Sequence, residues 1–213
     1  REVNRAWTSR PTPILDKFAL DLTDLARSEK IGFLIGHKEE YERLLNIISR
    51  PAKSAVLLVG ESGVGKETIV KRLAYQITKD RVSSSLFDKR LMSLDLGSLV
   101  AKATPEEFPA RLKQIIDEVA ANSELILFID ELHNIIGAGS NGSTMDAANI
   151  LKPALARGLL RCIGATTIDE YNKYITGDPA LERRFQAIHV AEPSADEACT
   201  ILHGIKQYYE DFH

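Results

Sequence analysis

The fold of this chain is decided by eight consecutive residues, Gly60-Glu61-Ser62-Gly63-Val64-Gly65-Lys66-Glu67. They match the phosphate-binding pattern G-x-x-x-x-G-K-[ST] except at the last position, where Glu67 replaces a hydroxyl residue. Glycines let backbone N–H groups close around an anion, and the lysine reaches the outer phosphates. The missing hydroxyl normally ligates magnesium. The stretch therefore predicts a nucleotide-binding loop and leaves its capacity for hydrolysis open.

The sequence on both sides of the loop fits a strand-loop-helix unit. An uninterrupted apolar run, residues 55–59, precedes the loop, as expected of a strand covered on both faces. Behind the loop, apolar residues recur at helical spacing: Ile69, Val70, Leu73, Ala74 and Ile77. This context favours nucleotide binding over an ordinary glycine turn. Thr68 is a further loop contact, but one step along a helix turns a side chain by about 100°, so we do not expect it to replace the missing hydroxyl.

Composition limits the classes of function. The 213 residues, 44% of them hydrophobic, can form one large domain, and a net charge of −3 gives no electrostatic case for nucleic acid. No stretch approaches the ~20 apolar residues of a membrane span, and no secretory signal is evident. Cys162 and Cys199 lack metal or redox spacing and are expected to be buried thiols. The sequence predicts a cytoplasmic protein that binds neither nucleic acid nor membrane.

Strand and helix patterns alternate along the chain. The apolar runs lie at residues 55–59, 91–96, 125–129, 160–165 and 187–190, and the main helical patterns at 15–26, 39–49, 69–77, 108–119 and 198–205. The alternation predicts a three-layer α/β domain with a mostly parallel sheet. Residues 1–13 read as a linker from an upstream domain, 14–194 as the αβα domain and 195–213 as a last helix leading towards a further subdomain. Ser194 and Glu197 form a capping box that opens this helix.

Two acids, Asp130 and Glu131, end the third apolar run. At the tip of a buried strand, Asp130 would hold magnesium through water, and Glu131 would orient and polarise the attacking water. The alternative is a strand that merely ends in solvated acids, which the glycine loop upstream disfavours.

Hydroxyls and arginines follow later in the chain. Thr166 and Thr167 end the fourth run, where a hydroxyl could sense the γ-phosphate, although β-branched residues at a strand end are the simpler interpretation. Arg183 and Arg184 are either a solvated helix face or fingers that neutralise transition-state charge at a neighbouring subunit's nucleotide.

Four longer motifs, at residues 128–133, 146–158, 164–171 and 178–185, closely resemble the first ATPase domain of Clp-type AAA+ unfoldases of the ClpC/ClpB kind. The resemblance implies an AAA+ P-loop NTPase domain whose five parallel strands follow the order 5-1-4-3-2. It implies a homo-hexameric ring that uses ATP hydrolysis to unfold or thread polypeptide, with ATP or ADP and Mg²⁺ as cofactors. It also allows for a compartmental protease or adaptor as partner.

The resemblance also assigns roles by matching position. The implied catalytic residues are Glu131, Thr167, Arg183 and Arg184. The implied nucleotide-binding residues are Leu34, Ile35, Gly60, Glu61, Ser62, Gly63, Val64, Gly65, Lys66, Glu67, Thr68 and Asp130. Leu34 and Ile35 match the segment that packs on adenine, and Thr167 matches sensor 1. Asp130, through water, and Glu67 are the implied magnesium ligands.

The chain departs from the family pattern in two main places, Glu67 and the pore loop, and in smaller changes at Phe33 and His37. Glu67 brings a carboxylate near the phosphates, and such a repulsion is worth ~4 kcal/mol at about 4 Å and an effective dielectric of about 20. The family's pore-loop aromatic has no match in residues 100–108. His37 stands where an arginine is usual and is expected to be a surface or capping residue.

These departures keep a second function open. The intact Glu131, Thr167 and arginine pair favour an active unfoldase module. Glu67 and the altered pore loop favour a divergent nucleotide-binding or ring-scaffold module with impaired hydrolysis. A DNA-remodelling AAA+ ATPase is a third interpretation, which the acidic balance disfavours.

Overall fold

A computed structural model describes residues 10–31, 36–51, 53–104, 107–137, 148–158 and 160–212. In chain order the elements are α1 (Leu15–Phe18), β1 (Ala19–Asp21), α2 (Leu22–Arg27), α3 (Lys38–Ile48), β2 (Ala55–Val59), α4 (Lys66–Thr78), η2 (Ser84–Leu86), β3 (Arg90–Leu94), α5 (Leu96–Ala101), α6 (Glu107–Ala120), β4 (Leu125–Ile129), α7 (His133–Gly137), α8 (Ala148–Ala156), β5 (Cys162–Thr166), α9 (Ile168–Glu170), η4 (Tyr171–Ile175), α10 (Pro179–Glu182), β6 (Phe185–His189) and α11 (Ala195–Phe212). No helix among these residues is long and apolar enough to cross a bilayer.

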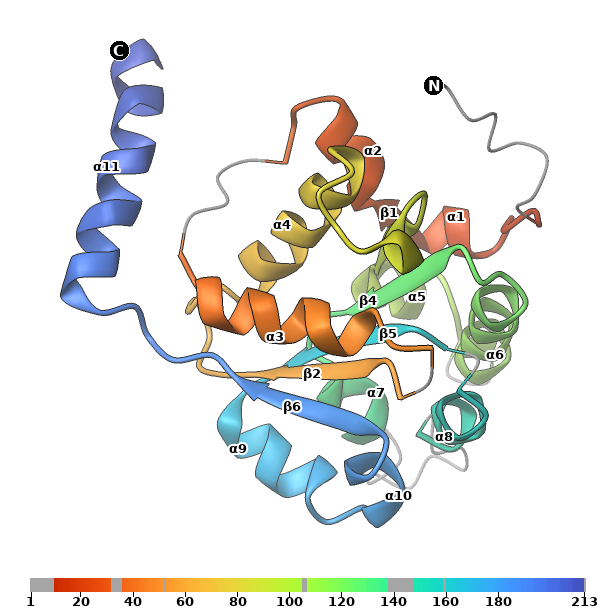
Figure 1. Cartoon of the computed structure of the whole chain (residues 1–213). Coiled ribbons are helices and arrows are strands. Elements are labelled where there is room, and N and C mark those ends of the chain that lie inside the picture. Colours follow the sequence, from red (N-terminus) through yellow and green to blue (C-terminus); the bar gives the residue numbers. More distant parts are fainter. Residues whose placement is uncertain are drawn as a thin grey trace.

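A six-stranded sheet of order β1-β3-β4-β5-β2-β6 forms the centre of the molecule (Figure 1). The strands from β2 to β6 pair in parallel, and their order is the one expected for five strands. The three-layer α/β fold is therefore confirmed. The sheet differs in detail, because β1 adds a sixth strand that runs antiparallel to β3 at one edge.

The single helix expected over residues 15–26 is wrong. The helix stops at Phe18, and residues 19–21 extend to pair with residues 92–94 of β3 before α2 begins. An unpaired edge of β3 would leave backbone groups without partners, and the three-residue strand satisfies them. The helical spacing of the apolar residues survives on both sides of the break, which is why the sequence pattern concealed it.

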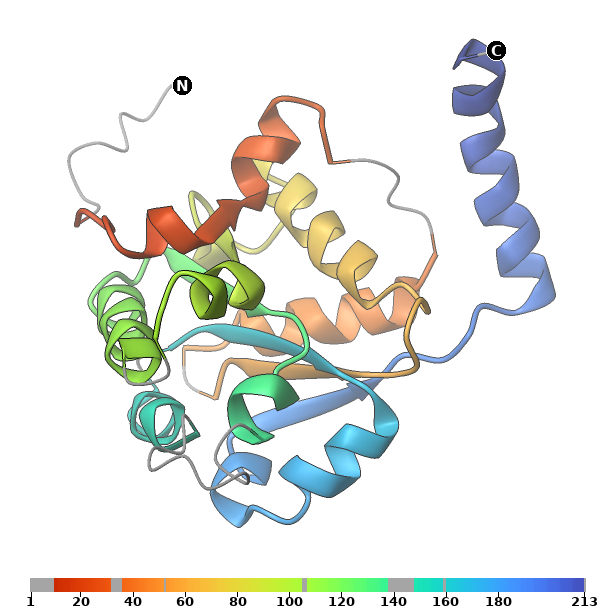
Figure 2. The same ribbon diagram turned by 180° about the vertical axis from the view of Figure 1, so that it is seen from behind.

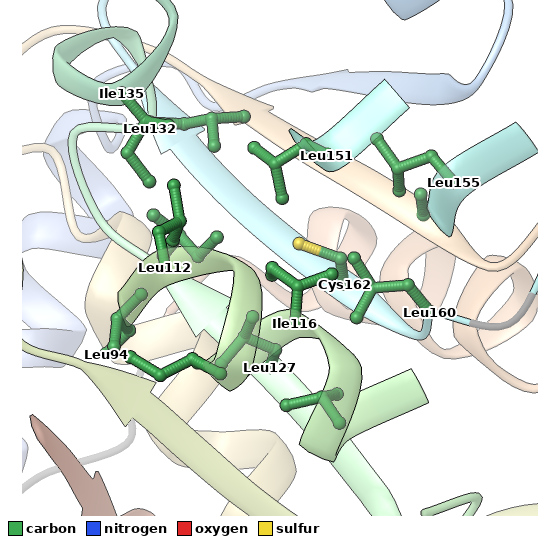
Figure 3. Close-up of a cluster of buried hydrophobic side chains, with 14 of the residues drawn as sticks. Leu94, Leu112, Ile116, Leu127, Leu132, Ile135, Leu151, Leu155, Leu160 and Cys162 are labelled. Carbon is green, nitrogen blue, oxygen red and sulfur yellow. The ribbon is translucent and has the colours of Figure 1, made fainter. Parts of the chain in front are cut away.

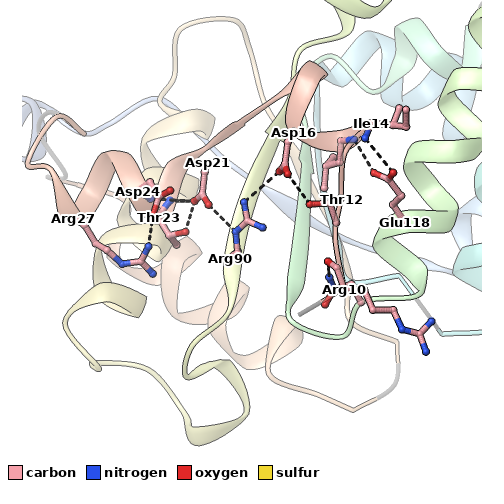
Figure 4. A network of polar contacts seen from close by, with 12 residues as sticks. Arg10, Thr12, Ile14, Asp16, Asp21, Thr23, Asp24, Arg27, Arg90 and Glu118 are labelled. Atoms are coloured by element: carbon pink, nitrogen blue, oxygen red, sulfur yellow. Dashed lines mark hydrogen bonds and ion pairs between the residues drawn. The ribbon is translucent and has the colours of Figure 1, made fainter. Parts of the chain in front are cut away.

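A polar network holds this break in place (Figure 4). The Asp21 carboxylate accepts the backbone N–H groups of Thr23 and Asp24 and so caps α2. The same carboxylate accepts Arg90 Nε at 2.9 Å, and Arg90 Nη2 lies 3.4 Å from Asp16 Oδ1. One arginine on β3 therefore fixes both the strand and the helix that follows it.

The segment before α1 is fastened to α6. Glu118 accepts the backbone N–H groups of Ile14 and Leu15 at 3.1 and 2.8 Å, and Asn122 Nδ2 donates to the Arg10 carbonyl at 3.0 Å. Residues 10–15 therefore lie against the body of the domain (Figure 4).

Helices cover both faces of the sheet (Figures 1 and 2). Helices α1, α5, α6 and α8 contribute to the core on one face, part of which Figure 3 shows, and α2, α3 and α4 to the core on the other. Along β2, Leu57 and Val59 enter the first core while Val56 and Leu58 enter the second. Strands β2, β4 and β5 are buried at every residue, which explains the uninterrupted apolar sequences of β2 and β4 and the mainly apolar sequence of β5.

The two cysteines differ in environment. Burial raises the pKa of the Cys162 thiol to about 12, so this side chain acts as a small core residue (Figure 3). Cys199 is exposed on α11, contrary to the expectation that both thiols are buried.

Helix α11 projects away from the sheet (Figures 1 and 2). Its start is fixed by the expected capping box, since the Glu197 N–H donates to Ser194 Oγ at 3.3 Å and the Ser194 N–H donates to Glu197 Oε2 at 3.1 Å. Ile201 reaches back to Gly36, where an added Cβ would lie 3.2 Å from Ile201 Cδ1.

We predict that Asp21→Ala lowers the free energy of unfolding by about 1–2 kcal/mol, because α2 loses its N-cap. Asp21→Asn should cost less, since asparagine caps nearly as well and loses only the charge facing Arg90. Urea denaturation of both variants tests this. Equal losses in the two variants would show that the ion pair with Arg90, and not the cap, stabilises the break.

Candidate nucleotide site

One pocket of about 290 Å³ collects most of the residues expected to bind nucleotide. It is lined by Ser62, Gly63, Gly65, Lys66, Glu67, Thr68, Asp130, Glu131, His133, Thr166 and Thr167. These residues follow or end β2, β4 and β5, whose carboxyl ends lie at the same edge of the parallel sheet. The topology thus brings three sequence motifs to one place.

The backbone of the loop requires glycine at specific positions. Gly63 and Gly65 have φ values of +84° and +104°, in the left-handed region. Gly60 is required because the neighbouring backbone leaves no space for a side chain: an added Cβ would lie 2.3 Å from the Val190 carbonyl oxygen. Gly65 is the N-cap of α4. The loop therefore presents the free N–H groups of a thirteen-residue helix to the pocket.

The Lys66 side chain folds over this loop. Its Nζ donates to the carbonyl oxygens of Gly60 and Glu61, each at 2.8 Å. The ammonium group thus lies beside the loop backbone at the N-terminus of α4. Its positive charge and the helix dipole both favour binding of an anion there.

Glu67 carries its own cation. Its Oε1 lies 3.1 Å from Nζ of Lys71, one turn further along α4, and the Glu67 side chain is 55% exposed. An acid in the first helical turn suits the helix dipole, and both Lys71 and solvent screen its charge. The repulsion of a bound phosphate is therefore smaller than the unscreened value of ~4 kcal/mol.

The oxygen atoms of the pocket suit magnesium only when a nucleotide supplies further oxygen ligands. Glu67 and Asp130 supply carboxylate oxygens to the pocket, and Mg²⁺ prefers oxygen. No group of three or more histidine, cysteine or acidic residues that could cage a metal occurs in the described part of the chain. This fits an ion held by one or two carboxylates together with phosphates and water.

The two acids after β4 are held by local hydrogen bonds. Asp130 Oδ1 accepts the Glu131 N–H at 2.9 Å, and Glu131 Oε2 accepts Asn134 Nδ2 at 2.8 Å. Glu131 has φ +48°, a conformation that costs a non-glycine residue energy and clusters at functional sites. The strained turn places this exposed carboxylate on the rim of the pocket.

The two threonine hydroxyls have different partners. Thr167 Oγ1 accepts the Glu170 N–H at 3.3 Å and caps α9. Thr166 is buried, and its Oγ1 lies 3.1 Å from His133 Nδ1. His133 was not identified as a site residue from the sequence, although it ends the motif at residues 128–133, two positions after Glu131.

The arginine pair lies apart from this pocket. Arg183 and Arg184 line a separate cavity of about 550 Å³ with Lys152, Pro153, Ala156, Pro179 and Ala180. Arg184 Nη1 donates to the Ala156 carbonyl at 3.3 Å. Nearby, a hydrogen bond from Lys152 and the N–H groups of α10 lower the pKa of Asp178. Within one chain the arginines are not brought to the loop.

Other expectations fall elsewhere. Leu34 and Ile35 lie outside the described residues, as do positions 105 and 106 of the altered pore loop. His37 occupies the N-cap position of α3 with φ +51°, although its side chain makes no capping bond. The expectation of a surface residue is wrong, because His37 is only 7% exposed.

A comparison with protein-family models matches residues 56–191 to the ATPase family associated with various cellular activities (AAA). This chain belongs to that family. The match begins within β2 and ends after β6, so it contains the whole pocket of the AAA chain.

Relatives narrow the resemblance to Clp-type chaperones. The AAA chain is 52% identical over 202 residues to the chaperone protein ClpB of Bdellovibrio bacteriovorus, covering 94% of the chain and 24% of that protein. It is 50% identical over 203 residues to the negative regulator of genetic competence ClpC/MecB of Bacillus subtilis, covering 95% and 25%. A closed-state structure of Hsp104 with ATPγS and FITC casein superposes with a TM-score of 0.83 at 42% identity, covering 94% of this chain and 34% of that one. The chain spans about a quarter of the length of these curated relatives.

We predict that Glu67→Thr tightens binding of a slowly hydrolysed ATP analogue in the presence of magnesium by up to about fivefold, because a screened charge is worth up to about 1 kcal/mol. Glu67→Gln should give a smaller gain, because it removes the charge without supplying the hydroxyl. Calorimetric titration measures both. An unchanged or weaker affinity in Glu67→Thr would show that Glu67 does not weaken nucleotide binding.

Proposed function

We propose that the AAA chain binds ATP and ADP with Mg²⁺ and hydrolyses ATP as a module of a Clp-type unfoldase. In this proposal, hydrolysis drives unfolding or translocation of polypeptide by a homo-hexameric cytoplasmic ring. The observation that carries it is the convergence of the glycine loop, Asp130–Glu131 and the threonines on one pocket. The similarity to ClpB and ClpC, and to Hsp104 bound to casein, supports polypeptide as the substrate class.

Different residues of the pocket have different roles in this proposal. The N–H groups of the loop and Lys66 bind the phosphates, and Glu131 orients the attacking water and takes its proton. Asp130 and Glu67 are the residues that would hold Mg²⁺, which would supply charge neutralisation of the bound phosphates. Thr166 and Thr167 provide hydroxyls at the end of β5, the strand that pairs with β2 beside the start of the loop.

The arginines act between subunits in this proposal. Arg183 and Arg184 line a different cavity from the loop, so they would reach the nucleotide of a neighbouring copy. A compartmental protease or adaptor is a further partner in this proposal.

A ring-scaffold function with impaired hydrolysis is the second candidate. Glu67 at the magnesium position and the lack of a matching aromatic in residues 100–108 are the observations that favour it. The two candidates differ in one measurable quantity, the rate of phosphate release.

We predict that the chain releases phosphate from ATP and that Glu131→Gln lowers this rate at least about 100-fold, because the water loses its general base. The same variant should keep its ATP affinity within about threefold, whereas Lys66→Ala should lose affinity. The assay is run over a range of chain concentrations, since the arginines come from a neighbour. A rate that Glu131→Gln leaves unchanged contradicts the proposed chemistry, and binding without phosphate release at any concentration would favour the scaffold.

A further inference from the structure

We propose that His37 is a positioning residue for the phosphate loop. Its imidazole holds the Val64 carbonyl and thereby aims the Gly65 N–H at the bound phosphates. The inference rests on the proposed nucleotide binding and concerns a side chain outside the loop motif.

The contact that carries the inference is short and buried. His37 Nε2 lies 2.7 Å from the carbonyl oxygen of Val64, in the middle of the loop. A carbonyl oxygen can only accept, so Nε2 carries the hydrogen and donates it. This holds both for the neutral Nε2–H tautomer and for the imidazolium.

The geometry of one peptide unit links this contact to the pocket. The Val64 carbonyl and the Gly65 N–H belong to the same planar trans peptide and point in opposite directions. Anchoring the oxygen on His37 therefore turns the N–H to the opposite side. Gly65 lines the pocket and is the N-cap of α4, so its N–H has no partner within that helix. It is free to donate to an anion.

The imidazole also packs directly on Gly65. A Cβ added at Gly65 would lie 2.9 Å from His37 Nε2, whereas one added at Gly63 would meet no atom within 4 Å. Gly65 is thus required by both its φ and its neighbour. The buried ring therefore packs against the loop at the residue before α4 begins.

Contacts from two helices hold His37 in place. His37 Nδ1 lies 3.8 Å from Glu40 Oε2 of α3. From α4, Arg72 Nη1 donates to the Gly36 carbonyl at 3.1 Å, and its guanidinium lies 4.5 Å from the centroid of the Tyr41 ring. The residue before His37 is therefore hydrogen-bonded to α4, the helix that follows the loop.

Three variants test this role by calorimetric titration with ADP. His37→Leu has similar bulk and no donor, and it should raise the Kd about tenfold, equivalent to about 1.4 kcal/mol. His37→Gln keeps an N–H near the Nε2 position and should stay within about threefold of the unsubstituted chain. His203→Leu, which removes an exposed histidine from α11, is the matched control and should change nothing.

A second measurement separates positioning from a general loss of structure. In chain labelled with ¹⁵N-glycine, ADP should shift the Gly65 amide proton downfield in the unsubstituted chain and in His37→Gln, and much less in His37→Leu. The amide of Gly164, buried in β5, should stay at one position in every variant and so report an intact fold.

The outcomes are distinct. If the unsubstituted chain binds ADP and His37→Leu binds as tightly, the positioning role is overturned while the proposed function stands. Equal losses in His37→Leu and His37→Gln also overturn it, because bulk and not the donor would then matter. If the unsubstituted chain does not bind ADP, the proposed function fails and the role of His37 fails with it.

Discussion

The site depends on the register of three buried strands. Strands β2, β4 and β5 send alternate side chains into cores on opposite faces, so a slip of one residue would exchange the two sets. The register pairs Val59 with Thr166 and Ile129 with Gly164. Strands β2 and β5 therefore end opposite each other, and β4 ends opposite Gly164, two residues before the end of β5. The loop, Asp130 and the threonines thus share one edge, although they lie far apart in the sequence.

Most of the fold could be predicted from the sequence, because the patterns that indicate its strands and helices are local. Each buried strand is a continuous apolar run, and the glycine loop between a strand and a helix fixes the fold class. The sixth strand was not readable, because β1 depends on Arg90, which lies 69 residues beyond Asp21 and binds it from another strand. A spacing pattern over residues 15–26 carries no information about such a partner.

The candidate site could be predicted from the sequence to a similar extent. The motifs identified the pocket lining, but they did not show how its members are held. Lys71 stands four residues after Glu67, a spacing at which helical side chains meet, so this ion pair left a signal that could have been used. His37 left none, because a positive φ and a contact with Val64 turn a residue expected at the surface into part of the loop's support.

The central claim is that this pocket binds nucleotide with magnesium although a carboxylate occupies the hydroxyl position. Calorimetric titration of the chain with ADP and with a slowly hydrolysed ATP analogue, each with and without magnesium, tests it most directly, with Lys66→Ala as the control. The account predicts binding that magnesium tightens and that Lys66→Ala abolishes or greatly weakens. Absence of binding, or binding that magnesium weakens, would contradict it.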